Sequence, residues 1–344
     1  MKLFFVVLAC FIMAAAFRRK GALYDFDSKA TLPLRGLLAI GIILHHLSLT
    51  YQFHECINAF RISPIFYFRE MGGPIVAIFF LITGYGLSKS LQIKGTSYLS
   101  GFLKKRLGKI MPEFLILTAL VLLFSVLTGA VSLSEAAHKM ATGYPPLLNS
   151  WFMYAIVYVY LAFYLSALIS TSDCLRTGIV LSLFIALYCG VVIALKWGGW
   201  WYLSIPAVSV GYFTALYENR ITKILSLRYM PVCIGACAVI YALMLGHIPG
   251  SRIMAALLFA VLTYVCMRLY SIRTYPILVL LGELSLYIYL VHGEILTATK
   301  YIETNKYLAG AIVILASVVV SMFIKRIRGF IESREFRVYS KNRA

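Results

Sequence analysis

Long apolar runs follow one another along almost the whole chain, and they constrain its fold more than any other feature. A helix needs about 20 apolar residues to cross the hydrocarbon core of a bilayer. Hydrophobic residues make up 61% of the 344 residues and charged residues only 13%. The pattern predicts an all-α polytopic membrane protein with ten core transmembrane helices. The predicted spans are Pro33–Tyr51, Met71–Lys89, Met111–Ala130, Trp151–Thr171, Thr177–Leu195, Trp200–Tyr217, Met230–Gly246, Arg252–Tyr270, Tyr275–Leu296 and Tyr307–Ile324.

A weaker apolar run, Leu3–Phe17, precedes these ten and is followed by the basic cluster Arg18–Lys20. Its short length resembles a signal peptide. The positive cluster behind it instead favours a retained N-terminal helix, and we expect this second alternative. The chain is therefore divided into an N-terminal hydrophobic segment with a basic linker (1–29), a membrane domain (30–324) and a basic tail (325–344).

The distribution of Lys and Arg predicts the orientation in the membrane. If Arg18–Arg35 is cytoplasmic and the sides alternate, the cytoplasmic segments hold 24 of the 32 Lys and Arg residues. Because basic residues gather on the cytoplasmic side, we expect a multi-pass protein of a bacterial inner membrane with a cytoplasmic C-terminus. The net charge of +19 is explained by this coating or by a docking surface for an anion. The loops are too short for a nucleic-acid site. The seven Cys show no zinc spacing and no disulfide framework, so no metal site is expected.

Two ionisable residues in the first core span are the strongest site candidates, because charged groups inside a membrane are costly. Arg35 and His46 are eleven residues apart, which is three helical turns plus about 20°, so they share one face about 16 Å apart. His45 is rotated by about 80° from that face. Arg35 could hold a phosphate or carboxylate, and His46 could accept a proton from a hydroxyl. The alternatives are an Arg that reaches the interface and a packed His.

Further candidates lie at three places along the chain. The cluster Lys104, Lys105, Arg106 and Lys109 is either a basic cytoplasmic loop or a pocket for the phosphates of an anionic donor. Near the end of the chain, Ser285, Tyr289 and His292 share one helical stripe. Glu283 faces away from that stripe and could pair with a Lys or Arg of another span. For Glu113, at the end of a span, solvation at the membrane interface is the expected explanation.

Five short motifs in order resemble the membrane acyltransferase family 3. They are the Arg35/His46 pair within Leu34–His46, Phe79–Tyr85, the basic run Phe102–Pro112, Trp151–Tyr154 and Ser285–His292. The resemblance extends from about Ala30 to Ile324, which is nearly the whole chain. The chain departs from the family pattern at Thr83, where Ser is usual, and at Lys109, where a second Arg is common.

The resemblance implies an integral membrane acyltransferase that moves an acyl group, typically acetyl, from acyl-CoA to a hydroxyl of a sugar or another cell-envelope acceptor. No permanently bound cofactor is implied, and acyl-CoA is the donor substrate. His46 and Arg35 would be catalytic, and Lys104, Lys105, Arg106 and Lys109 would bind the donor. The residues expected to contact or support the substrate are His45, Tyr85, Trp151, Glu283, Ser285, Tyr289 and His292. The alternative functions are a proton-coupled transporter and a structural membrane partner, neither of which would cleave a thioester.

Overall fold

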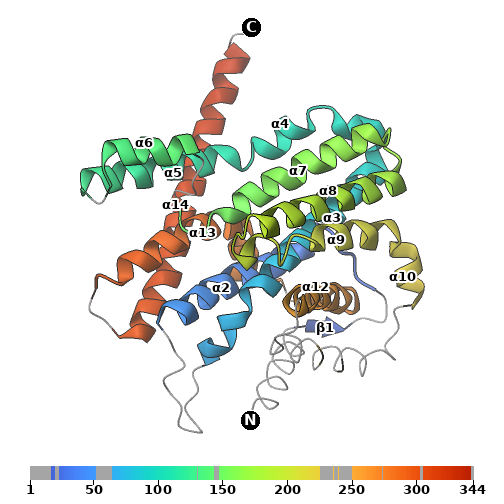
Figure 1. Cartoon of the computed structure of the whole chain (residues 1–344), viewed down its shortest axis with the longest axis horizontal. Coiled ribbons are helices and arrows are strands. Elements are labelled where there is room, and N and C mark those ends of the chain that lie inside the picture. The colour runs from blue at the N-terminus through green and yellow to red at the C-terminus, as the bar shows by residue number, and fades with distance from the viewer. Residues whose placement is uncertain are drawn as a thin grey trace. The chain divides into compact units, whose positions relative to one another are not determined.

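The computed structural model describes residues 17–19, 23–51, 64–129, 131–142, 147–224, 235, 239, 250–272, 274–302 and 305–341. Within these ranges the chain is predominantly helical (Figure 1). The predicted span Met230–Gly246 and residues 3–16 of the N-terminal hydrophobic segment lie outside the described residues.

Seven helices in the described part of the chain are long and apolar enough to cross a membrane. Two further apolar helices, α5 (Met111–Leu127) and α9 (Ala207–Leu216), are shorter. Each of the ten predicted spans that falls in the described residues therefore has a helix, while the exact count of ten spans plus one is not confirmed. The seven are α2 (Thr31–Thr50), α3 (Gly72–Lys94), α7 (Trp151–Ile169), α8 (Cys174–Ala194), α12 (Ser251–Leu269), α13 (Pro276–Thr299) and α14 (Lys306–Lys341).

The two short helices have local causes. Helix α5 is followed by a turn in which Gly129 has a φ of 71°, a left-handed conformation that glycine adopts without steric cost. The predicted span Trp200–Tyr217 is divided because a 3₁₀ turn, η4 (Gly199–Trp201), precedes a helix that begins only after Pro206. Proline cannot donate a backbone hydrogen bond, so it suits a helix start and not its interior.

A short β-ribbon was not predicted from the sequence. Strand β1 (Phe17–Arg19) pairs antiparallel with β2 (Tyr270–Ile272). Beyond the ribbon, the backbone N–H of Tyr24 donates to the carbonyl of Arg268 at 2.9 Å. The ring of Phe26 then lies 5.0 Å from the rings of both Tyr85 and Tyr264. This N-terminal segment is therefore held against the end of α12.

The chain divides into two compact units, each described by itself. Unit 1 comprises residues 1–34, 70–110 and 151–276, and unit 2 comprises residues 35–69, 111–150 and 277–344. The remaining helical elements are η2 (Pro64–Glu70), η3 (Gly95–Leu99), α4 (Phe102–Leu107), α6 (Leu133–Thr142) and α10 (Glu218–Ile224).

Unit 1 is built on a close contact between α3 and α9. Gly84 of α3 lies against the carbonyl of Val208, and Gly211 of α9 lies against the carbonyl of Leu81. Because each glycine faces the backbone of the other helix, the two helices approach more closely than side chains would allow. A glycine within an apolar helix predicts such a close approach from the sequence alone, and the structure confirms it at Gly84.

Unit 2 is built on the parallel helices α2 and α13. A Cβ at Gly36 would lie 2.5 Å from the carbonyl oxygen of Leu278, so the helices touch through their backbones at this end. The contact continues along both helices to a hydrogen bond of 2.9 Å from the hydroxyl of Tyr51 to Thr299. The core of this unit comprises Ala39, Ile43, Leu47, Leu281, Leu284, Ile288 and Val313.

Replacing Gly84 by Ala should destabilise the protein, because the added methyl group meets the backbone of Val208 and cannot be accommodated by a rotamer change. We expect a loss of about 1–3 kcal/mol, which is typical of an overpacked contact. The measurement is the apparent Tm of the purified protein in detergent. Gly86→Ala is the matched control on the same helix, where nothing lies within 4 Å of the added carbon. Equal Tm values for the two variants would contradict the close contact.

Candidate active site

In unit 2 the structure brings together two histidines from distant parts of the sequence. His46 lies on α2 and His292 on α13, with ring centroids 5.1 Å apart. His292 is fully buried, whereas His46 is partly accessible. The parallel register of the two helices causes this meeting, because Gly36 faces the first turns of α13 and ten further residues bring each helix to its histidine. The pair forms the polar centre of this end of the unit.

The hydrogen bonds of His292 define the chemical character of its two ring nitrogens. Nδ1 lies 3.1 Å from the carbonyl oxygen of Ile288 and 2.8 Å from that of Tyr289. Since both carbonyl oxygens are acceptors, Nδ1 must carry the proton and donate. In the neutral ring Nε2 then has a free lone pair. Within the described part of the chain, this buried Nε2 has no hydrogen-bond partner.

His45 has a different environment from its neighbour His46. Its Nδ1 lies 3.0 Å from the carbonyl oxygen of Phe68 in η2, to which it can donate a hydrogen bond. Its ring is 4.8 Å from that of His46. The rotation expected from helical geometry therefore directs His46 toward α13 and His45 toward η2.

Tyr289 links the histidine pair to the loop before α7. Its ring centroid is 5.8 Å from that of His292, and its hydroxyl donates to the carbonyl oxygen of Asn149. Ser285, one turn earlier on α13, is half-buried. The predicted stripe of Ser285, Tyr289 and His292 thus lies on one helix; His292 lies beside His46, and Tyr289 lies beside His292.

The opposite end of unit 2 contains Arg35 and several ion pairs. Arg35 is half-buried and adjoins Gly36, where α2 touches α13. The Glu283 carboxylate pairs with Lys325 of α14 at 2.5 Å, in a half-exposed position. This is the pairing with a Lys or Arg of another span that the sequence suggested for Glu283.

The interpretation of Glu113 as an interfacial, solvated residue was wrong. Its side chain is only 4% exposed and forms an ion pair with Arg328 of α14. It also accepts a hydrogen bond of 3.3 Å from the hydroxyl of Tyr287. The sequence could not reveal this burial, because Glu113 stands in the first turn of α5 and its partners lie on helices much later in the chain.

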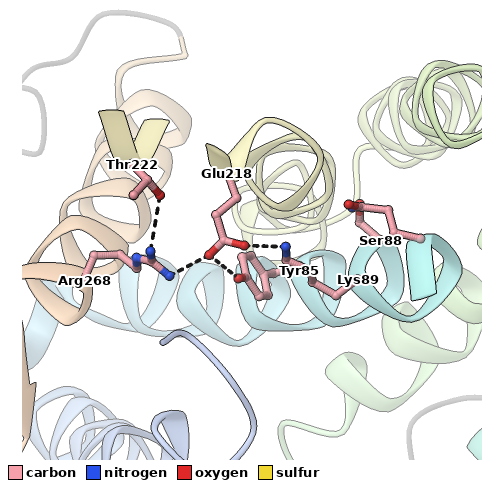
Figure 2. A network of polar contacts seen from close by, with 7 residues as sticks. Tyr85, Ser88, Lys89, Glu218, Thr222 and Arg268 are labelled. Atoms are coloured by element: carbon pink, nitrogen blue, oxygen red, sulfur yellow. Dashed lines mark hydrogen bonds and ion pairs between the residues drawn. The ribbon is translucent and has the colours of Figure 1, made fainter. Parts of the chain in front are cut away.

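Unit 1 contains a buried polar network centred on Glu218, the first residue of α10 (Figure 2). The Glu218 carboxylate accepts hydrogen bonds from the hydroxyl of Tyr85 on α3 and from Arg268 on α12, each at 2.6 Å. Lys89, one turn after Tyr85, completes the cluster with a second ion pair. Arg268 also donates to the hydroxyl of Thr222 at 3.3 Å. Five polar side chains thus connect α3, α10 and α12.

Electrostatics favour the charged form of Glu218. Burial alone would raise the pKa of its carboxyl group. The hydrogen bonds from Lys89 and Tyr85 and the charges of Lys89 and Arg268 outweigh burial and hold the pKa below its ordinary value of 4.5. The carboxylate is therefore ionised at neutral pH and stabilises unit 1 through its cationic partners.

The sequence analysis expects Tyr85 to contact or support the substrate. It does not predict the polar network of Glu218, Lys89 and Arg268 in which the structure places Tyr85. The two cations were counted only as cytoplasmic charges. The available signal was Glu218 itself, a rare acidic residue directly after an apolar helix in a strongly basic chain.

The predicted donor-binding cluster is not uniform in the structure. Lys104, Lys105 and Lys109 are exposed, whereas Arg106 is half-buried. The Arg106 guanidinium donates to the hydroxyl of Tyr98 at 2.6 Å and lies 5.8 Å from the ring centroid of Tyr160. Burial lowers the pKa of Arg106, but Tyr98 and Tyr160 outweigh this effect and the pKa is raised.

Trp151 has an aromatic environment at the start of α7. Its ring centroid lies 6.2 Å from the rings of both Phe152 and Trp201. It belongs to unit 1, as do Tyr85 and the basic cluster, whereas Arg35, His45, His46 and the α13 residues Glu283, Ser285, Tyr289 and His292 belong to unit 2.

Replacing Glu218 by Gln should destabilise the protein by about 3–5 kcal/mol, because the buried Arg268 loses its counter-charge. The contribution of a group with a lowered pKa is complete above its unfolded value and is lost as pH falls through the folded value. The Tm difference between wild type and Glu218→Gln should therefore be full at pH 7 and shrink below pH 4.5. Glu283→Gln is the control, since its exposed pair contributes about 0–1 kcal/mol. A pH-independent difference would contradict the assigned charge state.

The chain was compared with protein families, curated proteins and solved structures. Neither the curated proteins nor the solved structures give a match to the chain. Residues 34–326 match the acyltransferase domain family, a range that begins next to Arg35 and ends in α14. This range covers far more than half of the chain and contains both histidines of the pair. The chain belongs to the membrane acyltransferase family 3, as its five motifs indicated.

Proposed function

We propose that this membrane acyltransferase transfers an acetyl group from acetyl-CoA to a hydroxyl of a sugar or another cell-envelope acceptor, with His46 at the reacting centre. Membership of the acyltransferase family and the apolar helices support the general class. The observation that carries the assignment of the centre is the contact between His46 and the buried His292. The enzyme would lie in a bacterial inner membrane with its C-terminus in the cytoplasm, as the distribution of basic residues favours.

The proposed reaction uses His46 as a general base. The imidazole removes the proton from the acceptor hydroxyl while the oxygen attacks the thioester carbonyl carbon. A new ester C–O bond forms, the C–S bond breaks, and the sulfur leaves and receives the proton from His46 as free CoA. A second route, in which the His46 ring carries the acetyl group before passing it to the hydroxyl, uses the same residue as a nucleophile.

The environment of His46 suits either route. Its neighbour His292 keeps its Nδ1 proton on two backbone carbonyls and has a lone pair on Nε2. A neutral, hydrogen-bond-accepting neighbour does not repel a proton on His46 as an imidazolium would. We therefore assign His292 as a positioning residue that packs against the ring of His46.

The donor would bind through positive charge. In unit 1, Lys104, Lys105 and Lys109 are exposed and could attract an anion such as the phosphates of CoA. In unit 2, Arg35 is a half-buried cation on the same helix face as His46. The offset of about 16 Å between Arg35 and His46 separates an end suited to an anionic donor from an end suited to a neutral hydroxyl acceptor. Arg106 is committed to Tyr98 and Tyr160, so we assign it mainly to the structure of α4.

Replacing His46 by Ala should lower the rate of acetyl transfer by about 10²–10⁴-fold, the usual contribution of a general base. The measurement is CoA release from labelled acetyl-CoA by purified protein in lipid vesicles. The matched control is His45→Ala, which changes the neighbouring ring and its bond to Phe68. We expect the control to keep most of the activity. Full activity of a well-folded His46→Ala variant would disprove the assignment, and substrate transport without CoA release would favour a transporter.

Changing Lys104, Lys105 and Lys109 together to Gln should raise the KM for acetyl-CoA without lowering kcat. The reason is that exposed cations attract the donor by long-range charge, which also makes the wild-type KM rise with salt. The variant should show a weaker salt dependence. A matched triple change of the exposed cations Lys94, Arg176 and Lys196 controls for net charge. Equal KM values for the two triple variants would contradict the donor role.

A further inference from the structure

The loop that docks beside the histidine pair suggests a residue that binds the acceptor. Leu148 and Asn149 lie in unit 2, just before α7, and contact α13 at residues on either side of His292. We infer that Asn149 is a hydrogen-bonding residue of the acceptor site and that Glu294 is a positioning residue that holds it there. This inference rests on the proposed acyl transfer and specifies its acceptor side.

Three contacts fix the loop on α13. The backbone N–H of Leu148 donates to Oε1 of Glu294 at 2.8 Å. The hydroxyl of Tyr289 donates to the carbonyl oxygen of Asn149. Gly293 lies between these residues, and a Cβ there would be 3.0 Å from Cβ of Leu148. These distances leave little room for a side chain at position 293, so the loop backbone packs closely on α13 at the residue that follows His292.

The side chain of Asn149 is the polar group that this docking presents. A Cβ at Gly293 would lie 3.2 Å from Nδ2 of Asn149, so the amide lies over the helix next to His292. Asn149 is half-buried at this point of the fold. A primary amide offers both donors and an acceptor to a hydroxyl.

The backbone of Asn149 also departs from ordinary geometry. Its φ is 62°, in the left-handed region that non-glycine residues rarely adopt. Asparagine tolerates this conformation better than most residues. The three contacts with α13 hold the residue in this conformation, and the result is an amide held against α13 at Gly293, the residue that follows His292.

The position along the helices favours the acceptor over the donor. The loop lies at the His46 end of unit 2, eleven residues along α2 from Arg35. The end with Arg35 offers cations for an anionic donor, whereas Asn149 is a neutral group suited to hydroxyls. A sugar or polyol is the acceptor class that fits an amide placed beside a base.

The test replaces Asn149 by Gly, which removes the amide but adopts a positive φ without strain. Glycerol serves as the acceptor probe, and CoA release is followed with and without it in lipid vesicles. We expect the KM for glycerol to rise about 3- to 10-fold, as for one lost neutral hydrogen bond, with no comparable rise in the KM for acetyl-CoA. Lys196→Gly is the matched control, because Lys196 also has a positive φ of 56°.

Glu294 supplies a second, conservative series. Glu294→Gln keeps a carbonyl oxygen for the Leu148 N–H and should resemble wild type. Glu294→Leu removes that acceptor and should raise the KM for glycerol as Asn149→Gly does. If Glu294→Gln is impaired as strongly as Glu294→Leu, the carboxylate acts by its charge and the positioning role is wrong.

The remaining outcomes separate this inference from the proposed function. An unchanged KM for glycerol in Asn149→Gly, or an equal rise in the KM for acetyl-CoA, would overturn the acceptor role. Wild-type protein that hydrolyses acetyl-CoA but never uses glycerol would also contradict it. If wild type released no CoA from acetyl-CoA, or released it as fast as His46→Ala does, the proposed function itself would be overturned.

Discussion

The parallel packing of α2 against α13 determines the arrangement of unit 2. Gly36 allows the two backbones to touch near one end, and this contact sets the register of the two helices. With that register, His46 meets His292 about three turns later, and Tyr51 meets Thr299 beyond them. A side chain at position 36 would separate the helices and alter the distance between the two rings. Gly36, which has no side chain, therefore sets the distance between His46 and His292, the two residues of the proposed reacting centre.

In both units, helices are held together by close backbone contacts and by ion pairs. A helix in lipid gains little from burying apolar side chains against another helix, so close backbone contact and polar pairing provide the attraction. In unit 1, Gly84 and Gly211 bring α3 and α9 together, and Glu218 then links α10 to α3 and α12. In unit 2, Glu113 and Glu283 both pair with cations of α14. The few acidic residues of a basic chain thus hold helix ends together.

The sequence predicted features that follow from the geometry of a single helix, and it missed contacts that depend on how two helices pack. Helical periodicity separated His46 from His45, and glycine chemistry indicated the contact at Gly84. The meeting of His46 with His292 could not be derived, because the sequence does not give the register between helices. Glu113 and Glu218 were misjudged or overlooked for the same reason, since their partners are far away in the chain. Helix ends were also uncertain, as the late start of α9 after Pro206 shows.

The position of Arg106 has a consequence for donor selection. Its planar guanidinium, the group best suited to grip a phosphate in a fixed orientation, is turned toward Tyr98 and Tyr160. The water-facing part of the cluster consists of lysines, which act as mobile point charges with no preferred geometry. As the donor site that we propose, such a surface would attract any polyanionic carrier and would distinguish poorly between the acyl chains attached to it. The choice between an acetyl and a longer acyl group would then be made by the apolar surroundings of the thioester.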